Sequence, residues 1–169
     1  MTRPLLLLLL LLPLVACGYH PPGRGSQLPV EVQTVAIEFF RNATLEPLLE
    51  NVVTTAVSQR LIRGRALRVV DEARSADAVL TGEVSSYLTE PVAYDSQDEI
   101  ARWRSTMQVA AVLRRVSNGE VLWKGAASWR EEYAASLDKA FQEDLEAAAI
   151  ATMGDRIAEE LYFRMADNF

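Results

Sequence analysis

Cys17 is the residue with the most specific chemistry in this sequence, and it is the only cysteine among 169 residues. It follows Leu14, Val15 and Ala16, behind an unbroken run of leucines at 5–12 and a single positive charge at Arg3. A charge, a short apolar run and a small residue before a cleavage point are typical of a secretory signal peptide. The Leu-Val-Ala-Cys ending resembles a bacterial lipobox, which predicts acylation of Cys17 and cleavage just before it.

The apolar leader is too short to remain as a membrane span. Twelve residues from Leu5 to Ala16 rise about 18 Å as a helix, against a hydrocarbon core of roughly 30 Å. Acyl chains on Cys17 would anchor the chain instead, since each buried methylene contributes about 0.8 kcal/mol. We therefore predict a signal peptide at 1–16, a lipidated Pro- and Gly-rich tether at 17–29, and one folded domain at 30–169.

Composition narrows the chemistry of that domain. Cleavage before Cys17 leaves 153 residues with 16 basic and 23 acidic side chains, a net charge of −7. This acidity argues against a general nucleic-acid binder. With Cys17 acylated, the domain has no thiol, and the single histidine, His20, lies in the tether. We expect no enzyme, cofactor or metal site, because a His-based triad and a Cys- or His-rich metal cluster both lack their residues.

The apolar periodicity predicts a single α/β domain, a mixed and mostly antiparallel sheet with two helices on one face, as in an α/β sandwich. We expect strands at 30–40, 66–70, 78–89, 103–116 and 121–133, and helices from a turn at 41–44 to Gly64 and from 138 to 165. Thr44 should cap the first helix, and Pro91 should end the third strand. Residues 92–100 should then form an acidic surface loop.

The second helix should bury a stripe near one face, formed by Phe141, Leu145, Ala148, Thr152, Ile157 and Leu161. The acids of this helix, Glu146 among them, are interpreted as solvating charges.

Residues 103–133 form the clearest hairpin, and the side-chain pattern decides its register. A three-residue turn with Gly119 in the left-handed conformation places Trp103, Met107 and Leu113 on one face with Trp123 and Tyr133. A two-residue turn would instead set charged residues beside apolar ones. We therefore expect the three-residue turn.

The opposite face of this hairpin should carry a group of basic residues in an otherwise acidic chain. They are Arg102, Arg104, Arg114, Lys124 and Arg130. Phosphate and carboxylate groups bind such side chains through charge-assisted hydrogen bonds. The alternative is that this is only the wet side of an antiparallel sheet. We retain the five residues as candidate ligand contacts.

Three segments together resemble the LptE family of lipopolysaccharide-assembly lipoproteins. They are Cys-Gly-Tyr-His at 17–20, Val-Ala-Ile-Glu-Phe-Phe-Arg-Asn-Ala-Thr-Leu-Glu-Pro at 35–47, and Ala-Asp-Ala-Val-Leu-Thr-Gly-Glu-Val at 76–84. The resemblance implies an outer-membrane lipoprotein that faces the periplasm, plugs the LptD-type β-barrel and helps to place lipopolysaccharide in the outer leaflet. It implies direct lipopolysaccharide binding in some members, and no catalysis.

A strand followed by Phe-x-Asn-x-Thr and a helix also occurs in other envelope lipoproteins. Curli-secretion-type subunits and activators of peptidoglycan synthases are the alternative class. Co-purification separates the hypotheses, because a large barrel protein supports the first, and a homo-oligomeric ring or a synthase supports the second.

Overall fold

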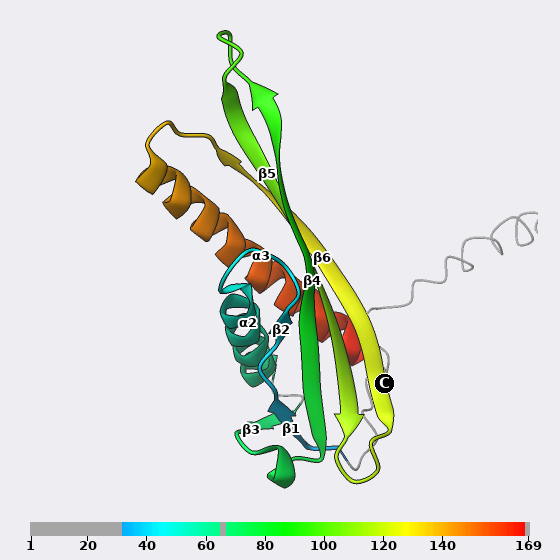
Figure 1. The fold of residues 1–169 in the computed structure, drawn as a ribbon. Coiled ribbons are helices and arrows are strands. Elements are labelled where there is room, and N and C mark those ends of the chain that lie inside the picture. The colour runs from blue at the N-terminus through cyan, green and yellow to red at the C-terminus, as the bar shows by residue number, and fades with distance from the viewer. Residues whose placement is uncertain (1–31, 65–66, 168–169) are drawn as a thin grey trace, which may run out of the picture.

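The computed structural model describes residues 32–64 and 67–167, so the predicted signal peptide, Cys17 and the tether lie outside the described residues. The elements follow in the order β1 Thr34–Ile37, β2 Arg41–Asn42, α2 Leu49–Gly64, β3 Arg68–Val70, β4 Ala78–Tyr94, β5 Ile100–Arg115, β6 Val121–Ala134 and α3 Lys139–Asp167, with a 3-10 turn at Ala73–Ser75 between β3 and β4. Three long strands make an elongated, twisted ribbon that extends well beyond α2 (Figure 1).

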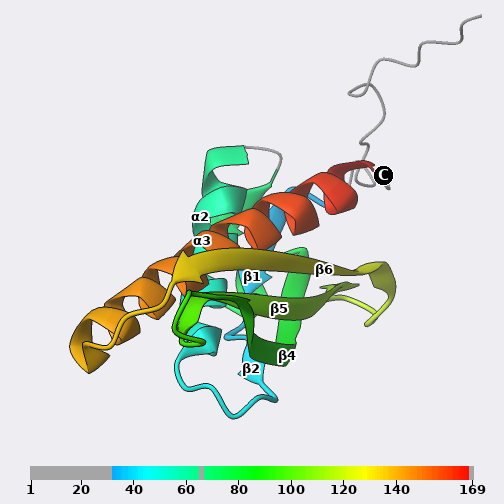
Figure 2. The ribbon, with the colours of Figure 1, turned by 90° about the horizontal axis from the view of Figure 1, so that it is seen from above.

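The described strands form one sheet in the order β3-β1-β4-β5-β6, and β2 also pairs with β4. The pairings of β1 with β3, β1 with β4 and β2 with β4 are parallel, whereas β4–β5 and β5–β6 are antiparallel. The predicted mixed sheet is confirmed, although it is less uniformly antiparallel than expected. Seen from above, α3 lies along β6, and both helices cover the same face (Figure 2).

The first strand differs from its prediction because it lies between two parallel neighbours. Val35 is 0% exposed and Ala36 is 2% exposed, so both of its faces are buried. Arg41 and Asn42, expected in a turn, pair with β4 as β2. Thr44 does not cap α2, which begins at Leu49; its hydroxyl donates to the Asn42 Oδ1 at 2.8 Å and braces the loop before the helix.

The predicted hairpin register is confirmed. Trp103 lies opposite Tyr133, Met107 opposite Trp129 and Leu113 opposite Trp123. Gly119 has a φ of 72°, the left-handed conformation that the three-residue turn requires. The predicted stop at Pro91 is wrong, because β4 continues to Tyr94 with register shifts beside the proline. Proline is tolerated there because that part of β4 is an edge strand, where an N–H is not needed for the ladder.

The core lies between the sheet and the two helices. Phe40, which is 1% exposed, packs its ring directly over Gly82 of β4. The buried stripe of α3 consists of Ala149, Met153, Ile157, Ala158, Leu161 and Met165. The predicted stripe was wrong in its first half, since Phe141 is 56% exposed and Ala148 and Thr152 are also exposed. The first turns of α3 stand over a pocket rather than over packed side chains.

Candidate functional site

The structure places the five predicted basic residues on the open face of the β5–β6 hairpin, opposite the helices. Strand pairing sets Arg104 beside Glu132, Thr106 beside Arg130 and Val112 beside Lys124. Because a strand rises about 3.3 Å per residue, Arg104 and Arg114 are roughly 33 Å apart. The five residues therefore form two groups rather than one patch.

The distal group, at the end of the hairpin away from the turn at 117–119, consists of Arg102, Arg104 and Arg130. Two of these side chains already have a carboxylate partner. The Arg104 guanidinium donates to Glu132 Oε1 at 2.7 Å and 3.1 Å and lies 3.9 Å from Glu90. Arg102 reaches the other oxygen of Glu132 at 3.4 Å. These hydrogen bonds, led by that of Arg104, lower the pKa of the Glu132 carboxyl. Two of the three distal cations are therefore engaged within the protein.

The proximal group, Arg114 and Lys124, lies near the turn at 117–119. Arg114 donates to the carbonyl of Gly119 at 3.4 Å. Within the described residues, no ion pair is recorded for Arg114, Lys124 or Arg130. Side chains at diagonal positions on neighbouring strands lie about 7–8 Å apart at the backbone, so Arg114 and Lys124 can approach one anion together.

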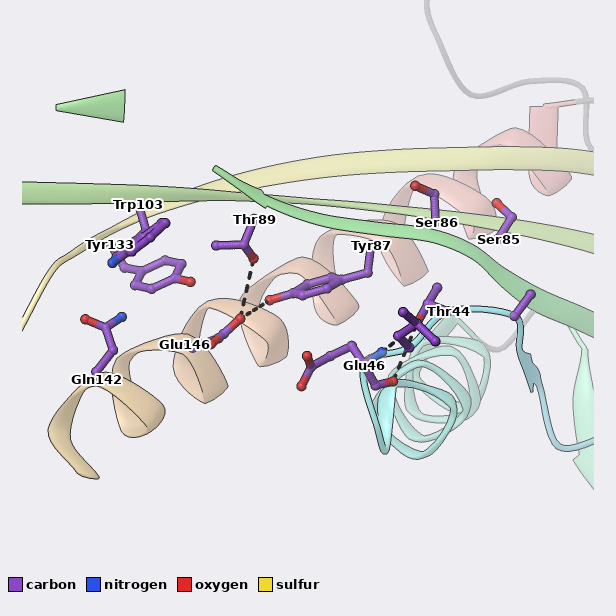
Figure 3. A pocket seen from close by; sticks show the side chains of 12 residues that line it. Thr44, Glu46, Ser85, Ser86, Tyr87, Thr89, Trp103, Tyr133, Gln142 and Glu146 are labelled. Carbon is purple, nitrogen blue, oxygen red and sulfur yellow. Dashed lines mark hydrogen bonds between the residues drawn. The ribbon is translucent and has the colours of Figure 1, made fainter. Parts of the chain in front are cut away.

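A pocket of about 670 Å³ on the helix side of the sheet was not predicted from the sequence. It lies between the distal half of β4, the loop before α2 and the first turns of α3 (Figure 3). The lining residues are Ala43, Thr44, Leu45, Glu46, Ser85, Ser86, Tyr87, Thr89, Trp103, Tyr133, Gln142 and Glu146. The pocket therefore combines aromatic rings, hydroxyl groups and two carboxylates.

A network of hydroxyl groups holds one wall of the pocket together. The Ser105 hydroxyl, which is 0% exposed, lies 2.7 Å from Thr89 Oγ1, 3.1 Å from the Tyr87 hydroxyl and 3.3 Å from the Tyr133 hydroxyl. The Tyr87 hydroxyl donates its single proton to Glu146 Oε1 at 2.7 Å. Glu146 is thus part of this network, which corrects its interpretation as a solvating charge. Such hydrogen bonds fix side-chain positions because a buried hydroxyl without a partner is costly.

The electrostatics of the pocket are unfavourable for additional negative charge. The pKa of the Glu46 carboxyl is raised, first because this group is partly buried and second because the negative charge of Glu146 lies nearby. Burial is also the main cause that raises the pKa of Tyr87 and of Tyr133, so both phenols stay neutral at physiological pH. The pocket therefore suits a cationic or polyhydroxyl group rather than an anion.

The sequence contained a signal for this pocket that is clear only in hindsight. Thr89 and Ser105 occupy strand positions that face the helices, where the neighbouring positions are apolar.

Within residues 32–64 and 67–167, no group of three or more His, Cys, Asp or Glu residues is placed to hold a metal ion. No helix in the same residues combines the length and apolarity needed to cross a membrane.

The chain is similar to a known protein family and to several solved structures. A family model described as LptE, lipopolysaccharide-assembly, matches residues 32–165. The rare lipoprotein B structure from Shewanella oneidensis matches with a TM-score of 0.55 and 16% identity, covering 79% of this chain and 94% of that one. Uncharacterized lipoprotein B from Nitrosomonas europaea matches with a TM-score of 0.54 and 14% identity, covering 88% and 90%.

Protein XCC0632 from Xanthomonas campestris is also similar, with a TM-score of 0.58 and 13% identity over 83% of this chain and 89% of that one. At these identities the solved structures show a shared fold and no more. No curated protein matches the chain.

Proposed function

Because the chain belongs to the LptE lipopolysaccharide-assembly family, we propose that it is a lipid-anchored plug of an LptD-type β-barrel on the periplasmic side of the outer membrane. There it supports the placement of lipopolysaccharide in the outer leaflet without catalysing a reaction. The family match carries this proposal, and it favours lipopolysaccharide assembly over the alternative class of envelope lipoproteins.

The shape and surface of the ribbon support a position inside a barrel. The 17 residues of β4 span roughly 56 Å, more than the roughly 30 Å of a hydrocarbon core. The open face of the sheet carries polar side chains between the basic groups, among them Thr81, Glu83, Thr106, Gln108 and Ser128. Since the interior of an outer-membrane barrel is polar, a long ribbon with such a face fits that environment.

Depletion of the chain in its native host tests the role in assembly. We expect lipopolysaccharide labelled at the cell surface to fall while it accumulates inside the envelope, and the wild-type chain to restore it. Normal surface labelling after complete depletion would contradict the proposal.

We further propose that the proximal group, Arg114 and Lys124, contacts phosphates of lipopolysaccharide or acids of the barrel, with the distal group in a secondary role. The distal arginines Arg102 and Arg104 already donate to Glu132, whereas the proximal pair has no recorded carboxylate partner in the described chain. Each charge-assisted hydrogen bond to a phosphate contributes about 1.5–3 kcal/mol.

Matched double variants separate the two groups. Arg114→Gln with Lys124→Gln should weaken lipopolysaccharide binding by tenfold or more, and wild-type binding should weaken as salt rises. Arg102→Gln with Arg104→Gln removes the same charge and should have a smaller effect. Changing all five basic residues should leave the melting midpoint nearly unchanged, since exposed side chains contribute little to stability. Unaltered binding by the fivefold variant would show that this face is only solvated.

A further inference from the structure

The outer edge of β4 has strand partners along only its first half. β1 pairs with it as far as Leu80 and β2 as far as Val84, where the Ala43 N–H donates to the Val84 carbonyl at 3.0 Å. β4 itself continues to Tyr94. Within the described residues, no strand pairs with this edge beyond Val84. An edge of this kind presents unpaired N–H and C=O groups to which another strand can add.

Two irregularities limit the usable part of this edge. The ladder with β5 shifts between Val84 and Ser86, and Pro91 has no N–H to donate. The stretch from Ser86 to Glu90 between them is regularly paired with β5. These five residues span about 17 Å, which is the length of a common strand.

The pocket opens directly beside this stretch. Tyr87 and Thr89 direct their side chains toward α3, and the Glu46 carboxylate points toward α3 from the other side (Figure 3). Glu146 also lies there, and its Oε1 accepts a hydrogen bond from the Tyr87 hydroxyl at 2.7 Å. A cation between Glu46 and Glu146 would relieve the repulsion between these carboxylates, and the rings of Trp103 and Tyr133 line the space for the apolar stem of a long side chain.

We infer that Ser86–Glu90 of β4 accepts an extended segment of a partner chain as an added strand, and that one lysine or arginine of this segment enters the pocket between Glu46 and Glu146. Main-chain hydrogen bonds along the edge supply affinity, and the pocket supplies the choice of side chain, as in other cases of strand addition. Successive side chains of an added strand point to opposite faces of the sheet. One basic residue on the face toward the helices is therefore enough to fill the pocket.

Exposed apolar residues lie at the proposed seat on both faces of the sheet, Leu45 on the helix side and Leu88, opposite Thr106, on the open face. Leu45, which lines the mouth of the pocket, is fully exposed, and Leu88 on β4 is 58% exposed. An added strand would cover part of both. The inference holds whichever protein supplies the segment, so it does not depend on the barrel being the partner.

Photo-crosslinking of the full-length, lipid-anchored chain in its native envelope tests the position of the segment. p-Benzoylphenylalanine replaces Leu45 or Leu88, and Ile62 or Val121 serves as the matched exposed position elsewhere on the surface. We expect Leu45 and Leu88 to capture one and the same partner peptide, with a lysine or arginine in it, and the controls not to capture it. No captured peptide, or one without a basic residue, would overturn the inference.

Charge variants test the role of the two carboxylates. Glu46→Gln with Glu146→Gln keeps the shape of the pocket and should lower the crosslinking yield about tenfold. Glu143→Gln with Asp155→Asn removes two exposed acids from α3 and should leave the yield unchanged. Equal yields from the two variants would refute a cation in the pocket.

Hydrogen exchange tests strand addition itself. A synthetic peptide with the captured sequence should slow amide exchange within Ser86–Glu90 of the purified protein, and a version with its lysine or arginine changed to glutamate should not. Binding without protection at these amides would exclude an added strand. A captured peptide from a protein other than the barrel would support this inference and would leave the proposed function to the depletion experiment.

Discussion

The contact between Phe40 and Gly82 offers a quantitative test of how the chain is packed around β4. A Cβ atom placed at position 82 would lie 2.0–2.5 Å from atoms of the Phe40 ring. Phe40 is 1% exposed and belongs to the hydrophobic core, so a shift of its ring would disturb neighbouring core side chains. The contact also holds the start of the loop that forms one side of the pocket.

We predict strong coupling between substitutions at these two positions. Phe40→Ala removes a buried ring and should lower the free energy of unfolding by about 3–5 kcal/mol. Gly82→Ala places a methyl group in the space that the Phe40 ring occupies and should lower the free energy of unfolding by about 1–3 kcal/mol. In the double variant the methyl group occupies part of the cavity, so its cost should be close to that of Phe40→Ala alone. The coupling free energy should therefore be about 1 kcal/mol or more.

Urea unfolding of the chain from Ser26 onward measures this cycle. Midpoints and slopes are compared for the wild type, the two single variants and the double variant, and unchanged slopes show that only stability has moved. Ser128→Ala on the open face replaces Gly82→Ala in a control cycle and should add to Phe40→Ala within about 0.5 kcal/mol. Additive effects of Phe40→Ala and Gly82→Ala would refute the packing described here.

Three further predictions concern other parts of the chain. The Asp77 carboxylate accepts a hydrogen bond from the Thr34 hydroxyl at 2.7 Å, which lowers the pKa of Asp77. Asp77→Asn should therefore lower the melting temperature of the domain at neutral pH. In thermal melts against pH, the difference in melting temperature between wild type and variant should close as the pH falls below 3.8, the usual pKa of an aspartate. Ser105→Ala leaves buried hydroxyls short of a partner and should cost about 1–3 kcal/mol in urea unfolding. Cys17→Ala should leave the precursor uncleaved by the lipoprotein signal peptidase, as intact mass and membrane fractionation would show.

The parts of the fold that sequence could predict are those decided by local pattern. The register of β5 and β6 follows from large apolar side chains that alternate along both strands, because a slip of one residue would expose all of them. Gly119 fixes the turn between these strands. For the same reason, the placement of Arg104, Lys124 and the other three basic residues on the open face could be foreseen.

What sequence could not predict depends on neighbours that are distant along the chain. The burial of both faces of β1 requires β3 and β4 on either side, and Pro91 is tolerated only because its part of β4 lies at an edge. The pocket brings together Glu46 from the loop before α2, Tyr87 from β4 and Glu146 from α3.

The most direct test of the proposed function is native mass spectrometry of the complex purified from outer membranes through the lipid-anchored chain. We predict one copy of this chain bound to one copy of a large β-barrel protein, with the mass of the chain showing acylation at Cys17. A homo-oligomeric ring, a peptidoglycan synthase, or an unaccompanied chain after gentle extraction would contradict a role as a plug of the barrel.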